Sequence, residues 1–111
     1  METSYFAKSG HHPNAVSIAG GCPPGFSGRQ YRVLAPKYWF FAKYKRDHDE
    51  VFYTEQYRKE VLSVLDPKKV FEDLGEDTIL ICWEKSGEFC HRRLVAEWLE
   101  KNLGIQVPEL K

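Results

Sequence analysis

The chain has 111 residues, 42% of them hydrophobic, and a formal net charge of zero. This length suits one modest core and is too short for two, so we expect one domain over residues 1–111. A balanced charge argues against a dedicated nucleic-acid-binding protein, which usually carries a strong basic excess, and leaves nucleic acid as a weakly supported partner.

The chain shows no sign of a membrane or secretory destination. No apolar stretch approaches the roughly 20 residues of a membrane helix, and the N-terminus lacks the basic and apolar regions of a signal peptide. We therefore expect a cytoplasmic protein with no membrane contact. The cysteines number three and have no regular spacing, which predicts reduced thiols rather than a disulfide framework.

The N-terminal part predicts two short strands followed by a loop. Residues 3–7 are β-prone, and residues 15–19 alternate small and apolar side chains. The next segment, 20–28, combines four glycines with two prolines, which can continue neither a strand nor a helix. Ligands of open α/β sheets bind beyond the carboxyl ends of strands. We expect this loop, with Gly28, to close over a ligand, although a plain surface connection is the competing interpretation.

The middle of the chain predicts three helices. One covers residues 37–46 with a run of aromatic side chains, and a second covers about 49–65 with apolar residues at three- and four-residue spacing. Asp66 and Pro67 begin a third, which Gly75 ends. Aromatic side chains at helical spacing usually pack in a core, so we expect the same here.

The last third contains the clearest strand and the last helix. Residues 78–83 form a continuous apolar run, typical of a strand buried on both faces of a parallel sheet. An apolar stripe predicts a helix that Gly104 ends, and residues 105–107 predict an edge strand. Together these patterns predict a compact α/β fold with a small, mainly parallel sheet flanked by helices.

Reactive side chains gather at the junction between that strand and the last helix, residues 82–93. The first turn of the helix offers free backbone N–H groups, and Arg92 or Arg93 adds a guanidinium, so the junction could bind an anion. The same surroundings would make Cys90 a better nucleophile. In the structural interpretation, Cys82 and Cys90 are small buried side chains and one arginine faces water.

Three chemistries fit these residue types. A phosphatase-like thiol loop would pair Cys82 with Arg92, although their spacing is longer than such a loop uses. Acid–base catalysis would use Glu84 or His91 as the proton-transfer group.

The third chemistry is a zinc site. It would take Cys82, Cys90 and His91 as ligands, and its fourth would be Cys22, His11 or His12. Cys90 and His91 are adjacent, and adjacent residues of a helix point about 100° apart, which disfavours binding to one metal ion. We therefore expect no metal here and no cofactor.

The junction resembles the family called domain of unknown function 488. The matching residues are Cys82, Glu84, Lys85, Cys90, His91, Arg92, Leu94, Val95, Ala96, Glu97 and Trp98. Further similarity lies in residues 3–6, 17–18 and 31–36. The resemblance implies an α/β fold and a source in bacteria, archaea or their viruses, but no reaction. Longer members often carry an arginine after the second strand; if that arginine holds a ligand, either Arg29 replaces it here or the ligand differs.

The leading hypothesis is a site for a small anionic or nucleotide-like ligand at residues 82–93, with hydrolytic or transfer chemistry as an extension; whether the protein is an enzyme is left open. The candidate catalytic residues are Cys82, Glu84, Cys90 and His91. The candidate ligand-binding residues are Arg92, Arg93, Arg29, Gly28 and Tyr31. The alternatives are a cysteine-based redox or metal site, or a non-enzymatic module that contacts protein or nucleic acid through Tyr38, Trp39, Phe41 and Tyr44.

Overall fold

Within residues 1–110, four short strands form one sheet in the order β1-β4-β2-β3, and every neighbouring pair is parallel. This computed structural model describes residues 1–110. The strands are β1 (Glu2–Tyr5), β2 (Ala15–Ser17), β3 (Arg29–Gln30) and β4 (Ile79–Cys82). The predicted α/β class with a mainly parallel sheet is confirmed.

Strand β4 lies between β1 and β2 in the sheet, and all four of its residues are buried. Leu80 packs in the larger hydrophobic cluster with side chains of the helices, whereas Ile79 and Ile81 pack with Phe6 on the other face. Apolar side chains are therefore required on both faces, which explains why this strand is a continuous apolar run in the sequence.

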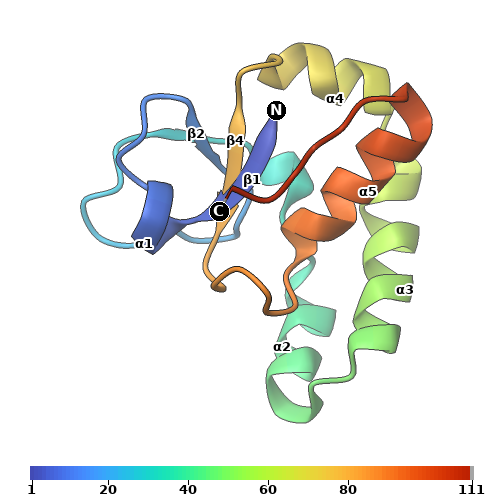
Figure 1. The fold of residues 1–111 in the computed structure, drawn as a ribbon. Coiled ribbons are helices and arrows are strands. Elements are labelled where there is room, and N and C mark those ends of the chain that lie inside the picture. Colours follow the sequence, from blue (N-terminus) through green and yellow to red (C-terminus); the bar gives the residue numbers. More distant parts are fainter. Residues whose placement is uncertain (111) are drawn as a thin grey trace.

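In the part of the chain that the structure describes, five α-helices accompany the sheet, and their bounds are α1 (Phe6–Ser9), α2 (Tyr38–Asp47), α3 (Glu50–Glu60), α4 (Pro67–Leu74) and α5 (His91–Leu103). Figure 1 shows α2 to α5 together on one side of the sheet and α1 on the other. Within residues 1–110, none of them has the length and apolar character that a membrane crossing requires.

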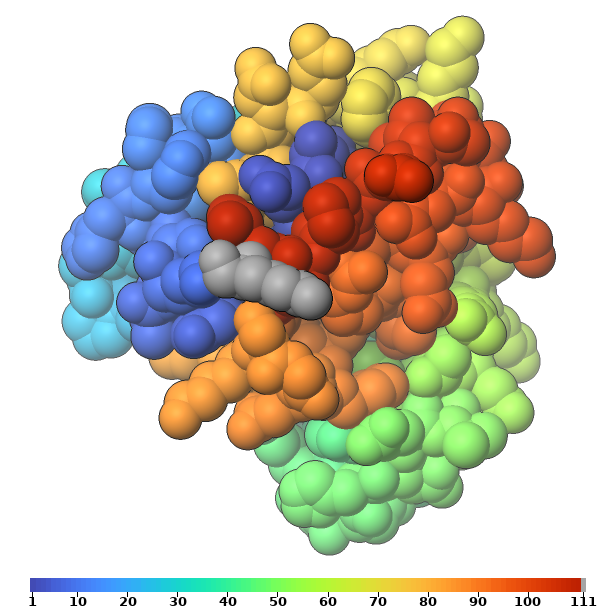
Figure 2. Space-filling model, viewed as in Figure 1, coloured from blue at the N-terminus to red at the C-terminus, as the bar shows by residue number. Residues whose placement is uncertain are grey.

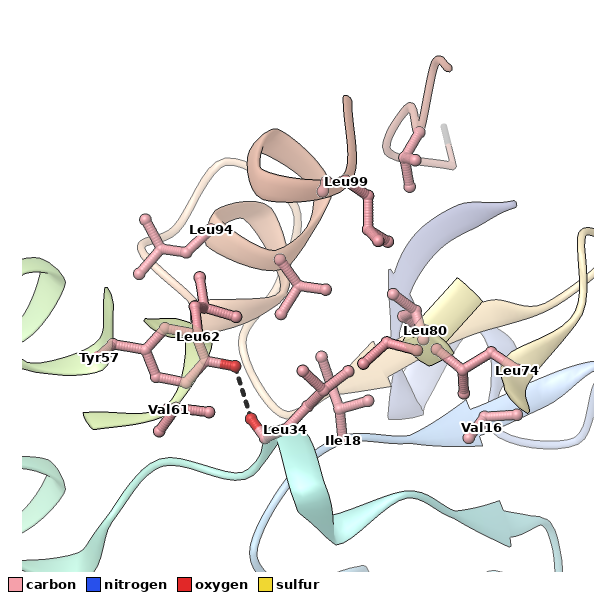
Figure 3. Close-up of a cluster of buried hydrophobic side chains, with 14 of the residues drawn as sticks. Val16, Ile18, Leu34, Tyr57, Val61, Leu62, Leu74, Leu80, Leu94 and Leu99 are labelled. Atoms are coloured by element: carbon pink, nitrogen blue, oxygen red, sulfur yellow. Dashed lines mark hydrogen bonds between the residues drawn. The ribbon is translucent and has the colours of Figure 1, made fainter. Parts of the chain in front are cut away.

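The main core fills the space between the sheet and helices α2 to α5. The aromatic ring of Tyr57 lies fully buried in this core, and its hydroxyl group donates a 2.6 Å hydrogen bond to the backbone carbonyl of Leu34 (Figure 3). Because the buried hydroxyl has a partner, Tyr57 contributes apolar area without an unsatisfied polar group.

Capping residues mark the start of α3 and the end of α5. Asp49 accepts a hydrogen bond from the N–H of Phe52 at the start of α3, and the left-handed Gly104 ends α5. The predicted helix over residues 49–65 is too long, because α3 ends at Glu60 and a separate 3₁₀ turn covers Leu62–Val64.

The C-terminal tail pairs with β1, later in the sequence than predicted. Residues 105–107 form no strand; instead the N–H of Thr3 donates to the carbonyl of Pro108, and the N–H of Leu110 donates to that of Thr3. Figure 2 shows this red segment lying against the blue N-terminal residues. The tail thereby brings Glu109 beside β1 and α5.

Candidate functional site

A cavity of about 420 Å³ lies at the carboxyl ends of β2 and β4, bounded by helices α2 and α3 and by the start of α5. Its walls are formed by Ala19, Gly20, Gly21, Pro36, Tyr38, Phe41, Tyr44, Tyr53, Cys82, Trp83, Glu84, Phe89, Cys90 and His91. The volume falls within the range of small-molecule sites, about 300–1,000 Å³. The position is the one at which open α/β sheets bind ligands.

All four candidate catalytic residues line this cavity. Cys82 is the last residue of β4, and Glu84 follows in the loop. Cys90 is the N-cap residue of α5, and His91 is its first helical residue. These four residues lie close together because β4 ends at the cavity and α5 begins there.

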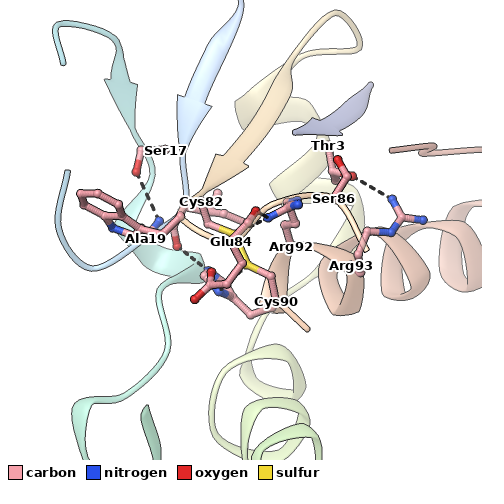
Figure 4. The surroundings of a disulfide bond; sticks show 12 residues. Thr3, Ser17, Ala19, Cys82, Glu84, Ser86, Cys90, Arg92 and Arg93 are labelled. Atoms are coloured by element: carbon pink, nitrogen blue, oxygen red, sulfur yellow. Dashed lines mark hydrogen bonds between the residues drawn. A yellow bond between two sulfur atoms is a disulfide. The ribbon is translucent and has the colours of Figure 1, made fainter. Parts of the chain in front are cut away.

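The two junction cysteines form a disulfide bond (Figure 4). The prediction of reduced thiols is therefore wrong for Cys82 and Cys90, and among the described residues only Cys22 is free. An odd cysteine count cannot reveal this pairing. The strand-to-helix turn brings together two thiols that are separated by eight positions in the sequence.

The imidazole of His91 is buried and held in one orientation. Its Nε2 lies 2.8 Å from the carbonyl oxygen of Ile18, and a carbonyl only accepts, so Nε2 carries the proton. Burial lowers the pKa of His91, the hydrogen bond to Ile18 raises it, and the charge of Arg92 lowers it, with a net value of about 4. The ring is therefore neutral near pH 7, and the unprotonated Nδ1 lies 3.8 Å from the sulfur of Cys90.

Glu84 is the one side chain with a formal charge in the wall of the cavity. Its carboxylate is partly buried, and the exposed amine of Lys45 lies 3.8 Å away. Burial raises the pKa of Tyr53, and the negative charge of Glu84 raises it further. Burial also raises the pKa of Tyr44, and the negative charges of Glu50, Glu84 and Glu88 raise it further. Glu84 therefore gives this part of the cavity a negative potential.

Arg92, a predicted ligand-binding residue, is not among the residues that line the cavity. Its side chain is only 1% exposed and makes a two-point ion pair with Glu109, at 3.0 Å from Nε and 2.8 Å from Nη2. Nη1 donates to the sulfur of Cys82 at 3.0 Å and to the carbonyl of Glu84 at 2.8 Å. The guanidinium thus joins the loop, the strand and the tail, and has no free face for an anion.

The arginine next to it is also engaged elsewhere. Nη1 of Arg93 donates to the hydroxyl of Thr3 and to the carbonyl of Val107, each at 2.8 Å. Because adjacent helical residues point in different directions, His91 faces the cavity while Arg92 and Arg93 face the tail and β1.

The other predicted ligand-binding residues lie away from the cavity as well. Arg29 donates to the backbone carbonyls of Asp73 and Leu74 and borders a separate hollow of about 200 Å³ beside residues 13–14 and 74–78. Tyr31 donates to the carboxylate of Asp73. Gly28 lies beside Phe26. Gly28 precedes β3, Arg29 starts it and Tyr31 follows it, and β2 separates β3 from β4 in the sheet.

Only the first part of the glycine-rich loop reaches the site. Gly20 and Gly21 line the cavity, and the indole N–H of Trp83 donates to the carbonyl of Gly21 at 3.0 Å. This bond joins the loop after β2 to the segment after β4, so two separate segments share one wall.

The sequence did not predict that aromatic side chains form a wall of this cavity; it favoured the core for them or, in the alternative hypothesis, a surface for a macromolecular partner. The six rings of this wall belong to Tyr38, Phe41, Tyr44, Tyr53, Trp83 and Phe89. Helical spacing favoured core packing, which holds for the buried Phe40 and Tyr57. The available signal was the uninterrupted aromatic run 38–41, since one face of a helix cannot bury four consecutive residues.

Among residues 1–110, the side chains that could hold a metal ion together are Cys82, Cys90 and His91, whose ligand atoms all lie within 4.8 Å of one another. None of the residues predicted as a fourth ligand, which were Cys22, His11 and His12, belongs to this group. His12 instead accepts a hydrogen bond from the N–H of Asn14.

Comparison with known proteins identifies a family. The sequence model of DUF488-N3a, described as "Active DUF488-N3 subclade", matches residues 11–103. No match was found among curated proteins or among solved structures. The family match covers both walls of the cavity and all four candidate catalytic residues. The chain therefore belongs to the DUF488 family, within the subclade DUF488-N3a.

Proposed function

We propose that the cavity binds a small nucleotide-like ligand through its flat base, and that Glu84 and the Cys82–Cys90–His91 end of the cavity act on it in a hydrolytic or transfer reaction. One observation carries this proposal. Four residues that can supply chemistry and six aromatic rings surround the same space of about 420 Å³. Such a combination of apolar walls and few polar groups is typical of ligand sites.

The lining favours a planar base over a free anion. Aromatic walls stack on flat rings, and no lysine or arginine lies among the lining residues. A carboxylate accepts hydrogen bonds from the exocyclic amino group of a base, which is the role we give to Glu84. The phosphate or sugar of the ligand would lie at the mouth of the cavity, where Lys45 is exposed.

The chemistry would take place at the inner end of the cavity. Glu84 is the acid–base group because its carboxylate is partly screened from water and its ion-pair partner, Lys45, is exposed. His91 is neutral and fixed by Ile18, so it can position the ligand without carrying charge. We also propose that the protein acts in the cytoplasm.

The first test is a thermal-shift screen with nucleobases, nucleosides and nucleotides. A ligand at 100 times its dissociation constant should add roughly 2.7 kcal/mol of apparent stability. We expect Glu84→Gln to weaken binding about 10-fold or more, because hydrogen bonds to charged groups contribute about 1.5–3 kcal/mol. Glu88→Gln is the matched control, since Glu88 is exposed and does not line the cavity.

A second variant fills the cavity instead of changing its charge. A Cβ added at Gly20 meets no atom within 4 Å, so Gly20→Leu should fold normally and place its side chain at the cavity wall. We expect it to lose the thermal shift entirely. Equal shifts in wild type, Glu84→Gln and Gly20→Leu would place the ligand elsewhere, and no shift from any of these compounds would refute the nucleotide-like ligand.

A further inference from the structure

We propose that reduction of the Cys82–Cys90 disulfide creates a zinc site in which Cys82, Cys90 and His91 are the ligands and the fourth position opens into the cavity. The three ligand atoms already lie within 4.8 Å of one another and all three side chains are buried. Two sulfurs and one imidazole nitrogen are donors that zinc prefers. This inference does not depend on the proposed nucleotide-like ligand.

The orientation of His91 suits a metal ligand. Nε2 donates its proton to the carbonyl of Ile18, so the lone pair of Nδ1 is available on the side of the Cys90 sulfur, 3.8 Å away. Metal-binding histidines almost always donate their second ring N–H to such a carbonyl or carboxylate. The expected obstacle, that adjacent Cys90 and His91 point apart, does not arise because Cys90 is the extended N-cap residue and only His91 is helical.

Arg92 supports the sulfur on the other side of the site. Its Nη1 donates to the sulfur of Cys82 at 3.0 Å, and its ion pair with Glu109 fixes the position of the guanidinium. A sulfur that accepts an N–H bond from a buried cation is stabilised as a thiolate, the form that binds metal. Two of the three proposed ligands, Cys82 and His91, therefore have hydrogen-bond partners that hold them in place.

The number of ligands determines the kind of site. Among the described residues the group contains three ligands, whereas structural zinc sites almost always have four protein ligands. All three line the cavity together with Glu84, so the remaining position faces that space. Three protein ligands with one open position is the arrangement of catalytic zinc sites, which activate water or polarise a bound oxygen.

The disulfide and the metal exclude each other, because both use the same sulfurs. A dithiol reductant donates two electrons and two protons to the disulfide and becomes a disulfide itself, which leaves two thiols on the protein. Binding of Zn²⁺ then displaces one proton from each thiol. The oxidised protein is consequently a folded form of the same chain that cannot bind the metal.

The test uses Co²⁺ and Zn²⁺ alone on reduced, metal-free protein under anaerobic conditions. We expect Co²⁺ to bind in an equimolar amount, with the thiolate-to-cobalt charge-transfer absorption and the intense visible bands of a tetrahedral site, and Zn²⁺ to displace it. Cys82→Ser and Cys90→Ser should each abolish the charge-transfer absorption at the same Co²⁺ concentration. Cys22→Ser is the matched control and should leave the spectrum unchanged.

A cysteine variant could lose metal binding because it fails to fold. Oxidised wild type avoids this ambiguity, since it requires no substitution. It should bind no metal at the concentration that saturates the reduced protein, and reduction should restore binding. A reduced wild type without the cobalt spectrum would refute the site. So would a spectrum that survives in both junction variants, or one that disappears in Cys22→Ser. None of these results changes the expected nucleotide screen, so the two proposals fail independently.

Discussion

Replacing Arg92 with methionine is expected to lower the free energy of unfolding by about 3–5 kcal/mol, the usual cost of leaving one partner of a buried ion pair without the other. Arg92 is 1% exposed and both of its bonds to Glu109 are short. Its loss also removes the donors to Cys82 and Glu84. Urea denaturation followed by circular dichroism measures the change.

The control for this prediction is a double-mutant cycle with Glu109→Gln. If the two charges stabilise one another, the double variant should be more stable than the sum of the two single effects predicts. Arg93→Met should cost less, because the partners of Arg93 are neutral. Unchanged stability of Arg92→Met would contradict the structural role assigned to this residue.

The oxidised, metal-free protein is expected to lose about 3 kcal/mol of stability as the pH falls from about 6.5 to about 4. His91 is buried and neutral, and its pKa is lowered from 6.5 to about 4. The unfolded chain binds this proton more readily than the folded one, so protonation favours unfolding. The stabilisation is complete above pH 6.5 and is lost as the pH falls towards 4. Urea midpoints measured across this range test the prediction.

The matched variant is His91→Gln, whose amide can still donate to the carbonyl of Ile18 but does not titrate. Its stability curve should lack the wild-type decline between pH 6.5 and 4. Glu109 affects the stability in a lower pH range. Burial raises the pKa of Glu109, but hydrogen bonds from Arg92, Ser86 and Thr3 and the charge of Arg92 lower it to about 2. Its contribution is lost from pH 4.5 downwards, and equal slopes for wild type and His91→Gln above that pH would contradict the His91 assignment.

The sequence was sufficient to predict the parts of the site that lie close together along the chain. A continuous apolar run predicts the buried strand β4, and a strand followed by a helix brings Cys82 near Cys90 and His91. The prediction that these residues and Glu84 share one location needs only the rule that parallel strands present their carboxyl ends to ligands.

The contacts that decide each side chain's role are distant in sequence and could not be predicted. Glu109 lies in the tail and pairs with Arg92 only because the tail runs along β1. The carbonyl that holds His91 belongs to Ile18 at the end of β2. Without these partners, a buried structural arginine and an anion-binding arginine have the same sequence pattern.

The sequence also could not predict which aromatic side chains line the cavity and which pack in the core. Tyr44 and Tyr57 both belong to apolar helical stripes, yet Tyr57 is buried in the core and Tyr44 lines the cavity. The difference depends on which helix faces the sheet and which extends past its end. That arrangement is a property of the packing of α2 against α3, which the spacing of residues within one helix does not encode.

The central claim is that the cavity is the ligand site, and ¹H–¹⁵N NMR spectra of the labelled protein titrated with cytidine and adenosine test it most directly. The chain has three tryptophans, and of these only Trp83 lines the cavity. We predict that its indole signal shifts and saturates together with backbone signals of residues 19–21 and 89–91, while those of Trp39 and Trp98 stay in place. Shifts confined to Trp39, Trp98 or the hollow beside Arg29, or no shift at saturating nucleoside, would contradict the account.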